Sequence, residues 1–488
     1  MLRKFISKVS KVFGKAKTPA AATAKPASPR SRKQGPSILN ASEHQIDRAR
    51  LSRGALATVE GLQKAGYKAY VVGGAVRDLL LGRTPKDFDI ATDATPEQVH
   101  AQFRRSRLIG RRFRIVHVLF GQEQVEVSTF RTADLSEALT DEHGRVLRDN
   151  TFGSMEEDAA RRDFTVNAMY YDPLEQTVID YHGGVKDLRA KVLRIIGDPE
   201  ARFREDPVRM LRATRFAAKL DFSIDPKTRA PIRALAELLS NVPSSRLFDE
   251  MMKLLLSGHA VACVRQLRDE HLHHGLLPLL DVILEQPMGE KFVMLALART
   301  DERIGIGKGV SPGFLFAALL WHEALSRWNA LKARGEHSMP ALYQAMGEAI
   351  DMQRDKLAIQ NRIAADMREI WSLQPRFDRA ATGRGARTAF KLIEHPRFRA
   401  AYDFVLLRAE SGEIDAAIAD WWTRFIDADP PLRNEMAAAT RPPSKAVAGD
   451  DAGHEGPAPI DDAPKRRRRR RRKPAGDGAA AATPAGGE

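Results

Sequence analysis

The chain contains a single cysteine, Cys263, among 488 residues. A framework of intrachain disulfides is therefore excluded, and so is a zinc site built from several thiolates. The chain also has no apolar run of about 18 residues, the length that a membrane-spanning helix requires. Its longest candidate, residues 314–321, predicts a buried core helix instead. These absences exclude a disulfide-stapled module and an integral membrane protein, and we expect a cytoplasmic protein and, by default, a monomer.

Acidic residues are absent from residues 1–42, although the whole chain is 29% charged. The net charge is +15, which makes a polyanion the expected partner. In residues 1–13, apolar side chains recur at helical spacing between lysines, which would suit a helix on an anionic membrane surface. The composition of this stretch also resembles an organelle transit peptide. We prefer a third interpretation, in which residues 1–44 are a basic disordered arm.

The other end of the chain, residues 431–488, loses apolar periodicity and carries an unbroken basic block. Such a block cannot fold on itself, and its natural use is to bind a polyanion by counterion release without reading sequence. A purely solubilising tail is the alternative. The predicted RNA-binding residues are Lys465, Arg466, Arg467, Arg468, Arg469, Arg470, Arg471, Arg472 and Lys473.

Between these ends the pattern predicts an α+β fold, in which a small mixed sheet is followed by an all-helical part. Residues 18–42 resemble a linker, and order is expected to begin near Ser42, where Ser42-x-x-Gln45 offers a capping box. We expect a head domain over 45–195, a helical neck over 196–260 and a helical body over 261–430. The predicted strands cover residues 69–72, 88–91, 115–120, 125–130, 169–171 and 178–180.

The most informative segment follows the first of these strands. Gly73-Gly74 stands between an apolar strand and the start of a helix, where backbone N–H groups can cradle phosphate. Asp87-x-Asp89 follows shortly afterwards, and on a strand its two carboxylates would share one face. Oxygen ligands on one face can hold a hard cation such as Mg²⁺. A phosphate cradle beside metal-binding carboxylates predicts phosphoryl or nucleotidyl transfer.

Further motifs appear in a fixed order along the chain. They are Gly73-Gly74-x-x-Arg77-Asp78, Asp87-x-Asp89, Arg161-Arg162-Asp163-Phe164-Thr165-x-Asn167 and Glu205-Asp206-x-x-Arg209. Together they resemble the signature of the class II template-independent nucleotidyltransferases, a family that contains tRNA CCA-adding enzymes and bacterial poly(A) polymerases. The resemblance covers residues 45–260 densely and thins afterwards. It implies a nucleotidyltransferase head, a neck that recognises the nucleotide, and an RNA-binding body.

Within this family the chain resembles the poly(A) polymerases more than the CCA-adding enzymes, especially over residues 108–118, 149–153, 196–200 and 243–250. The implied function is the template-independent addition of AMP from ATP to RNA 3′ ends, with release of pyrophosphate, in mRNA processing and RNA decay. The alternative within the family is a CCA- or A-adding tRNA nucleotidyltransferase. An RNA-binding or scaffold protein that has lost activity is an alternative from another class.

The resemblance also implies roles for individual residues. Asp87 and Asp89 would hold two Mg²⁺ ions, one activating the RNA 3′-hydroxyl and the other neutralising the ATP triphosphate. Asp163 is our preferred third active-site acid, and Glu126, on a strand that could flank the pair, is its competitor. The implied nucleotide-binding residues are Gly73, Gly74, Arg77, Arg162, Asn167, Asp206, Arg209 and Arg212. Among them, Asp206 and Arg209 would read the incoming base.

Overall fold

The computed structural model describes residues 35–110, 114–132, 139–140, 146–148, 152–272, 287–357, 359–382 and 386–439. By its internal contacts the chain divides into residues 1–441 and 442–488, and every described residue belongs to the first unit. The segment 1–13 and the basic block 465–473 fall outside the described residues, so the membrane contact and the RNA-binding tail stay predictions. Among the described residues, no helix has both the length and the apolar character to cross a membrane.

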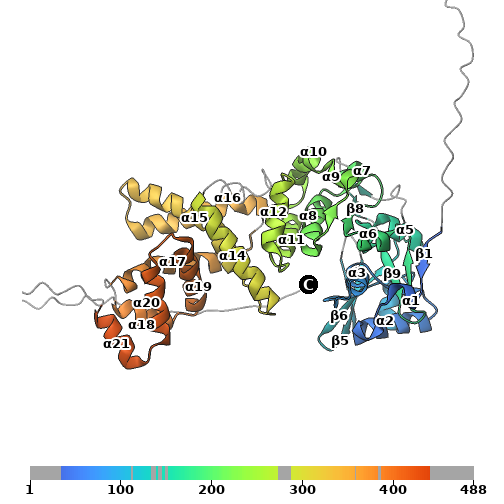
Figure 1. Cartoon of the computed structure of the whole chain (residues 1–488), viewed down its shortest axis with the longest axis horizontal. Helices are drawn as coiled ribbons and strands as arrows, with labels where there is room; N and C mark the ends of the chain where they lie inside the picture. The colour runs from blue at the N-terminus through green and yellow to red at the C-terminus, as the bar shows by residue number, and fades with distance from the viewer. Residues whose placement is uncertain are drawn as a thin grey trace, which may run out of the picture. The chain divides into compact units, whose positions relative to one another are not determined.

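An eight-stranded sheet forms the head (Figure 1), in the order β1-β10-β9-β2-β3-β6-β5-β4. The pair β3 and β6 is parallel, and the other neighbours are antiparallel, which confirms the predicted mixed sheet. The strands are β1 (Ser37–Leu39), β2 (Ala69–Val72), β3 (Asp89–Thr92), β4 (Ser106–Ile109), β5 (Ile115–Phe120), β6 (Glu123–Thr129), β9 (Met169–Asp172) and β10 (Thr177–Asp180). Two-stranded sheets pair β7 (Leu139–Thr140) with β8 (Val146–Arg148), and β11 (Val192–Leu193) with β12 (Ser223–Ile224).

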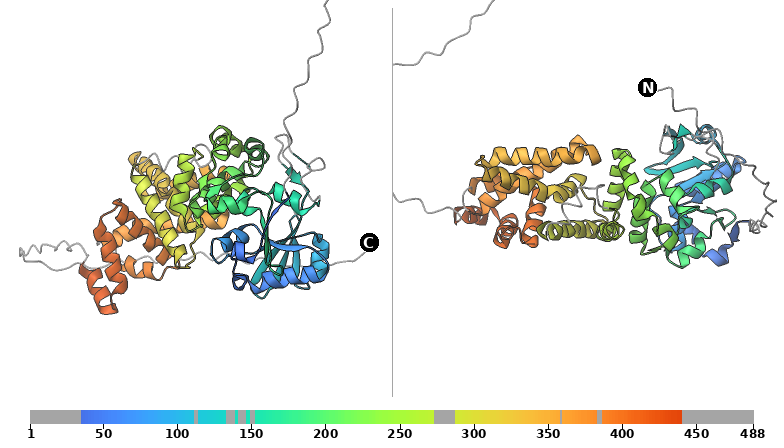
Figure 2. Two further views of the ribbon diagram at one scale, coloured as in Figure 1. Left: turned by 45° about the vertical axis from the view of Figure 1, so that its right-hand side comes forward. Right: turned by 90° about the horizontal axis from the view of Figure 1, so that it is seen from above.

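Alternation along the strands gives this sheet two different faces. Val71, Ile90 and Val127 belong to the main hydrophobic core, on the face that helix α2 (Arg53–Lys64) covers (Figure 2). Their neighbours Val72 and Ala91 belong to a separate small cluster on the opposite face. Because Asp89 lies two residues before Ala91, it belongs to this second face, where the sheet is not sealed by a continuous core.

Two local predictions were wrong. Order begins before Ser42, because β1 pairs with β10 through Ile38 and Ile179, so the arm predicted over 1–44 is structured at its end. The capping box of α1 (Ala41–His44) uses Asn40 and Glu43 rather than Ser42 and Gln45. A strand of three residues with an exposed side chain at its centre has too little pattern to be recognised in sequence.

The Asp-x-Asp prediction also needs a correction. Only Asp89 belongs to β3, and Asp87 lies in a bend that precedes the strand. Strand alternation therefore does not align the two carboxylates. They approach the same cavity because the chain turns immediately before it enters the sheet.

From residue 225 onward the described part of the chain is helical, as predicted. In the head and neck the remaining helices are α3 (Gly74–Leu80), α4 (Pro96–Gln102), α5 (Met155–Arg161), α6 (Gly184–Arg189), α7 (Pro199–Glu205), α8 (Val208–Leu220), α9 (Pro226–Arg229), α10 (Ile232–Leu235) and α11 (Ser244–Leu255). The later helices are α12 (Ala260–Asp269), α14 (Pro287–Gly305), α15 (Pro312–Ala333), α16 (Ser338–Leu357), α17 (Asn361–Ala381), α18 (Ala386–Ile393), α19 (Phe398–Ser411), α20 (Ala416–Asp427) and α21 (Pro430–Ala439).

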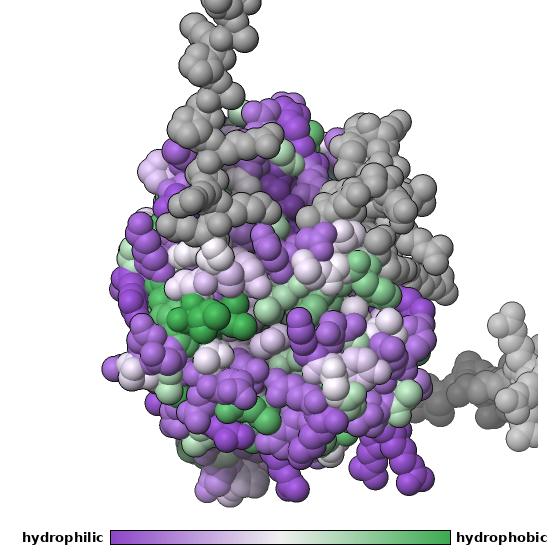
Figure 3. All heavy atoms as spheres, turned by 90° about the vertical axis from the view of Figure 1, so that its right-hand side faces the viewer, coloured by the Kyte–Doolittle hydropathy of each residue, from purple (hydrophilic) through white to green (hydrophobic). Residues whose placement is uncertain are grey.

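A second hydrophobic core joins α17 to α21 around Phe377 and Trp422. The face in Figure 3 is mostly hydrophilic, with a few small hydrophobic patches.

Candidate active site

The predicted site residues of the head and neck meet at one cavity of about 560 Å³. Every head or neck residue to which the resemblance assigned a catalytic or nucleotide-binding role, apart from the competing acid Glu126, lines it. They are Gly73, Gly74, Arg77, Asp87, Asp89, Arg162, Asp163, Asn167, Asp206, Arg209 and Arg212. A second cavity of about 300 Å³ shares four of these residues and adds Glu126, Ser128 and Arg246. Segments that are more than 100 residues apart in sequence therefore form one site.

The turn after β2 needs glycine because of its backbone conformation. Gly73 has φ of +75° and ψ of −131°, a conformation that residues other than glycine rarely adopt. The Cβ position of this residue lies within van der Waals distance of Arg162 and Asp89, at 3.6 Å from Nη1 and 3.9 Å from Oδ2, so the turn borders both side chains. The turn leads into α3, where Arg77 is buried and donates to Oδ1 of Asn167 at 2.7 Å and to Asp78 at 2.9 Å. This turn therefore brings backbone, guanidinium and carboxylate groups together.

Two carboxylates of this cavity, Asp87 and Asp89, lack compensating contacts within the described chain. Among the described residues, neither Asp87 nor Asp89 forms a hydrogen bond or an ion pair through its carboxylate. The parallel register places Asp89 directly beside Glu126. Burial and the neighbouring charge of Glu126 raise the pKa of Asp89 to about 6, with a smaller contribution from Asp87 that Arg162 opposes. Asp89 is therefore a carboxylate whose charge the protein alone does not stabilise.

Asp163 is in the opposite situation, because nearly all of its acceptor capacity is used. Its Oδ2 accepts from Nη2 and Nε of Arg212 at 2.6 and 2.9 Å, and its Oδ1 accepts from the backbone of Phe164 at 2.7 Å. The amide of Asn167 adds a weaker bond at 3.3 Å. Burial alone would raise the pKa of Asp163, but Arg212 and these hydrogen bonds outweigh it and lower the pKa to about 2.

Replacing Asp163 with asparagine should destabilise the protein at pH 7 by on the order of 2 kcal/mol. The folded-state pKa is below the unfolded value of about 3.9, so this stabilisation is complete above pH 4 and is lost as the pH falls toward 2. We expect the difference in unfolding free energy between wild type and Asp163→Asn, measured in urea, to be constant from pH 5 to 7. It should shrink below pH 4, and a difference that grows there would contradict the ion pair.

Arg162 is held by a buried cluster on the second face of the sheet. Its Nη2 and Nε donate to Oδ2 of Asp158 at 2.9 and 3.1 Å, and the hydroxyl of Tyr170 donates to the same oxygen at 2.6 Å. Burial would raise the pKa of Asp158, but Arg162 and these hydrogen bonds lower it. The guanidinium is thus fixed in place before any ligand enters the cavity.

The neck contributes part of the cavity lining. Oδ2 of Asp206 accepts from Nη2 of Arg246 at 3.0 Å, and Arg209 donates to Oε2 of Glu205 at 2.9 Å. Oδ1 of Asp206 and Nη1 of Arg246 are buried and have no hydrogen-bond partner within the described part of the chain. An unpartnered acceptor next to an unpartnered donor is costly unless a ligand completes the pairing.

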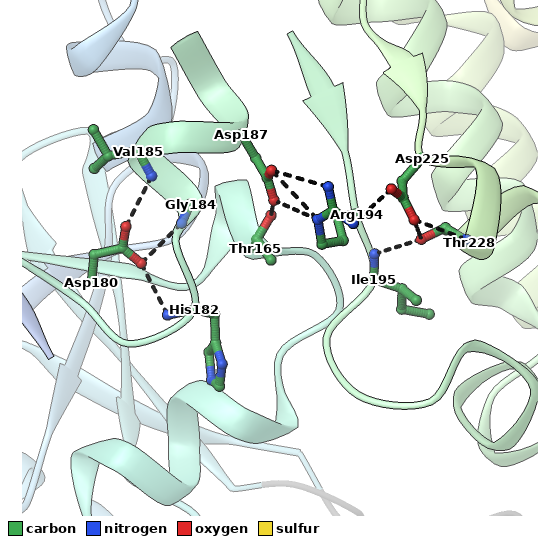
Figure 4. A network of polar contacts seen from close by, with 10 residues as sticks. All are labelled: Thr165, Asp180, His182, Gly184, Val185, Asp187, Arg194, Ile195, Asp225 and Thr228. Atoms are coloured by element: carbon green, nitrogen blue, oxygen red, sulfur yellow. Dashed lines mark hydrogen bonds and ion pairs between the residues drawn. The ribbon is translucent and has the colours of Figure 1, made fainter. Parts of the chain in front are cut away.

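A separate network connects the sheet to the neck (Figure 4). Oδ2 of Asp187 accepts from the hydroxyl of Thr165 at 2.7 Å and from Nε of Arg194 at 3.1 Å. Arg194 also donates to Oδ1 of Asp225 at 2.6 Å. Asp180 accepts from the backbone of Gly184 at 3.0 Å. Because Thr165 lies between Asp163 and Asn167, this network positions the turn that carries two of the cavity residues.

Comparison with known proteins assigns the family. Residues 69–194 match the family described as the poly A polymerase head domain, and residues 334–473 match the polymerase A arginine-rich C-terminus. Residues 221–284 match the family described as a probable RNA and SrmB-binding site of polymerase A. Poly(A) polymerase I of Salmonella typhi is 45% identical over 411 residues, covering 82% of this chain and 88% of that protein. The chain belongs to the poly(A) polymerase family.

Other relatives agree with this family assignment. Poly(A) polymerase I of Escherichia coli O157:H7 is 45% identical over 82% of this chain and 88% of its own length. The CCA-adding enzyme of Bacillus subtilis is 44% identical, but over only 46% of this chain. The crystal structure of the Bacillus stearothermophilus CCA-adding enzyme in complex with CTP has a TM-score of 0.50 and 27% identity, covering 80% of this chain and 81% of that one. The poly(A) polymerase family thus shares its fold with CCA-adding enzymes.

The sequence motifs did not predict three residues that line the larger cavity. These are Arg215, Phe216 and Lys253. Arg215 was visible as the third arginine of a stripe with Arg209 and Arg212, three residues apart on α8. Phe216 forms cation–π contacts with three arginines. The guanidinium carbons of Arg215, Arg212 and Arg77 lie 4.3, 5.3 and 5.4 Å from the centre of its ring. Lys253 comes from α11, and nothing in its local sequence indicates the cavity.

Proposed function

We propose that this protein adds AMP from ATP to RNA 3′ ends without a template and releases pyrophosphate. One observation carries the proposal: residues from four separate motifs line a single cavity that contains two carboxylates without ion pairs to any described residue, Asp87 and Asp89, together with five arginines and a lysine. This combination of charges suits a reaction between a polyphosphate and a hydroxyl. Membership of the poly(A) polymerase family supports RNA as the acceptor and ATP as the donor.

The two unpaired carboxylates of the cavity are suited to bind Mg²⁺. Asp87 and Asp89 offer hard oxygen ligands whose mutual repulsion a divalent cation would relieve. Within the described residues no group of three ligating side chains is gathered to form a cage by itself. Magnesium commonly takes one or two carboxylates and completes its shell with water and substrate phosphate. When bound, it would lower the pKa of the RNA hydroxyl and neutralise the triphosphate.

The arginines of the cavity bind the triphosphate in this proposal. Arg77, Arg162, Arg212 and Arg215 are each held by a carboxylate or an amide, so their charges are oriented in advance. Forked guanidinium groups suit phosphate oxygens, and fixing them beforehand reduces the entropy lost on binding. Since α3 has only seven residues, we assign the phosphate contacts mainly to these side chains rather than to its dipole.

The adenine base is read in this proposal by the neck. Asp206 and Arg209 line both cavities, and the buried atoms of Asp206 and Arg246 that have no partner supply an acceptor and a donor. An adenine edge presents a donor beside an acceptor, so it can complete both bonds at once. Selection of the nucleotide would therefore depend on Arg246 holding the orientation of Asp206 through their 3.0 Å ion pair.

We propose Glu126 as the third carboxylate and Asp163 as the residue that orients Arg212. Glu126 lies beside Asp89 in the parallel register, whereas the oxygens of Asp163 are already engaged. Glu126→Gln should raise the Mg²⁺ concentration that gives half-maximal activity by about tenfold, because the negative charge beside Asp89 that helps to attract the cation is removed. Asp163→Asn should leave that concentration within about twofold and instead raise KM for ATP. The reverse pattern in a Mg²⁺ titration would return the role to Asp163.

Phe216→Leu should raise KM for ATP by roughly tenfold and change kcat less. Each cation–π contact is worth about 0.5–1 kcal/mol at exposed sites and more when desolvated, and the ring orients three arginines together. Steady-state kinetics at saturating RNA would measure this effect. Phe216→Tyr should restore most of the affinity, and Phe222→Leu, which removes a buried ring elsewhere in the core, should not raise KM. A uniform loss in all three variants would indicate general destabilisation.

Primer extension tests the proposed function. A short RNA with a 3′-hydroxyl and a tRNA lacking its CCA end would each be incubated with Mg²⁺ and one nucleotide at a time. Long adenylate ladders on both RNAs, with little CTP incorporated, are the expected result. Addition of C-C-A confined to the tRNA would assign the protein to the CCA-adding enzymes instead, and no extension of either RNA would revive the scaffold alternative.

A further inference from the structure

Arg202, on α7, lies behind the lining of the active site and connects the neck to the head. Its side chain is 13% exposed and lines neither of the two cavities. Its Nη2 donates to the backbone oxygens of Arg161 and Arg162 at 2.6 and 2.7 Å, and its Nη1 donates to Oε2 of Glu205 at 2.6 Å. One guanidinium therefore holds both a head segment that carries two cavity arginines and an acid of the neck.

The head end of this connection is the C-terminus of α5. The helix ends at Arg161, and Arg162 is its C-cap. The last carbonyl groups of a helix have no partner within it, and they carry the negative end of its dipole. A guanidinium is favourable at this place, and here it fixes the backbone from which the side chain of Arg162 reaches the cavity.

The neck end of the connection is Glu205, which is shared between two cations. The oxygen that accepts from Arg202 also accepts from Nη1 of Arg209 at 2.9 Å. The same nitrogen of Arg209 donates to the backbone oxygen of Arg202 at 2.9 Å. Because Asp206 follows Glu205 directly in the chain, both residues to which we assign base reading are tied to the residue that holds the end of α5.

The position of Arg202 is not one that stability alone would favour. Burial lowers the pKa of Arg202, and the charge of Arg209 lowers it further, although Glu205 and Asp163 oppose this change. Its Nε is buried and has no hydrogen-bond partner in the described residues. A buried cation with an unsatisfied donor costs stability, which points to a role in the site.

We propose that Arg202 is a positioning residue that fixes the distance between the base-reading residues of the neck and the arginines that hold the triphosphate. The inference rests on the proposed function, which places the base at Asp206 and Arg209 and the phosphates at Arg162 and its neighbours. A purine has two fused rings and a pyrimidine has one, so the edge of adenine that the neck reads lies farther from the sugar than the edge of cytosine. At a fixed distance ATP reaches both sets of groups at once, whereas CTP reaches only one set at a time. Arg202 thereby contributes to the selection of a purine by its size.

Arg202→Gln tests this role, because it removes the connection and leaves the bonds of Arg209 to Glu205 and to the backbone in place. Binding of ATP, GTP and CTP to the full chain, with Mg²⁺ and without RNA, would be measured by isothermal titration calorimetry. A size difference of one group in a binding pocket is worth roughly 10–200-fold in discrimination, so we expect the ratio of Kd for CTP to Kd for ATP to fall by about tenfold. The ratio for GTP to ATP should change by no more than about twofold, because the two purines have the same length.

Two further variants serve as controls. Arg204→Gln removes an equal charge and an ion pair with Glu200 from the same helix, and it should leave both ratios unchanged. Arg202→Lys keeps the charge but lacks the fork that reaches the carbonyl groups and Glu205 together, so it should change the CTP ratio in the same direction by a smaller factor. This conservative variant covers the case in which Arg202→Gln fails to fold.

Three outcomes would overturn the proposal. Equal changes in the CTP and GTP ratios would indicate a general loosening of the site rather than a loss of size selection. An unchanged CTP ratio in Arg202→Gln, or a wild type that binds ATP and CTP equally, would show that Arg202 sets no such distance.

These binding ratios are separable from the proposed function. An enzyme that extends no RNA would refute polyadenylation, while the Kd ratios would still decide the role of Arg202. Conversely, normal adenylate ladders from the wild type with unchanged ratios in Arg202→Gln would retain the function and discard size selection through Arg202.

Discussion

Asp89→Asn should reduce the rate of AMP transfer by about a thousandfold or more without lowering the temperature of unfolding. The rate falls because a carboxylate that holds the catalytic cation is worth several kcal/mol of transition-state stabilisation, and each 1.36 kcal/mol corresponds to tenfold. Stability should not fall, because the charge of Asp89 is unfavourable in the protein alone. Its pKa is raised to about 6, so above that pH the ionised group works against the folded state.

Single-turnover extension of a labelled RNA and thermal unfolding without metal would measure the two effects. As the pH rises from about 4 to above 6, ionisation of Asp89 should lower the unfolding temperature of the wild type. Asp89→Asn should not show this contribution to the pH dependence. Asp420→Asn, an exposed acid on α20, is the matched control and should change neither quantity. If Asp89→Asn and Asp87→Asn left both activity and Mg²⁺ dependence intact, the proposed catalytic role of these two carboxylates would be wrong.

Gly184→Ala should destabilise the protein by about 3 kcal/mol, at the upper end of the cost of overpacking. An added Cβ would lie 2.2 Å from the backbone oxygen and 2.9 Å from the carbonyl carbon of Thr165. Neither side can yield easily, because Gly184 is held by Asp180 and Thr165 by Asp187 (Figure 4). Relief of the clash has to move the turn from Asp163 to Asn167, so KM for ATP should rise as well.

Denaturant unfolding and ATP kinetics would check both consequences. Gly309→Ala is a suitable control, since an added methyl group there meets no atom within 4 Å. We expect the control to unfold within about 0.5 kcal/mol of wild type, as surface substitutions usually do. If the two variants unfolded at equal denaturant concentration, the close contact between Gly184 and Thr165 would be wrong.

The sequence predicts much of the sheet because its strands alternate. Val71, Ile90 and Val127 are apolar positions that a period of two assigns to one face, and they do share a core. The neighbour relation between β3 and β6 was only a possibility in the sequence, since a parallel pair is joined by a long crossover that no local pattern specifies. The position of Glu126 beside Asp89 follows from that pairing alone.

The motifs also named the residues of the cavity better than they named their roles. Asp163 is an acid in a motif of reactive residues, and only its bonds to Arg212, 49 positions later, show that its charge is already matched. Lys253 carries no local signal, because it reaches the cavity through the packing of α11 against α8. The position of Asp87 relative to Asp89 likewise depends on the bend before β3. A bend has no periodic pattern in the sequence from which it could be predicted.

The cavity is completed late in the chain, and this has a consequence for biosynthesis. Asp87, Asp89 and Asp163 leave the ribosome before Arg212 and Arg215, and Lys253 follows Asp163 by 90 positions. At about 5–20 residues per second, that interval lasts roughly 5 to 18 seconds. A nascent chain that ends before α8 has the carboxylates together with Arg77 and Arg162, but it lacks Arg212, Arg215 and Lys253. We therefore expect unfinished or truncated products to bind ATP more weakly than the complete chain, because part of the cationic lining arrives only with the neck.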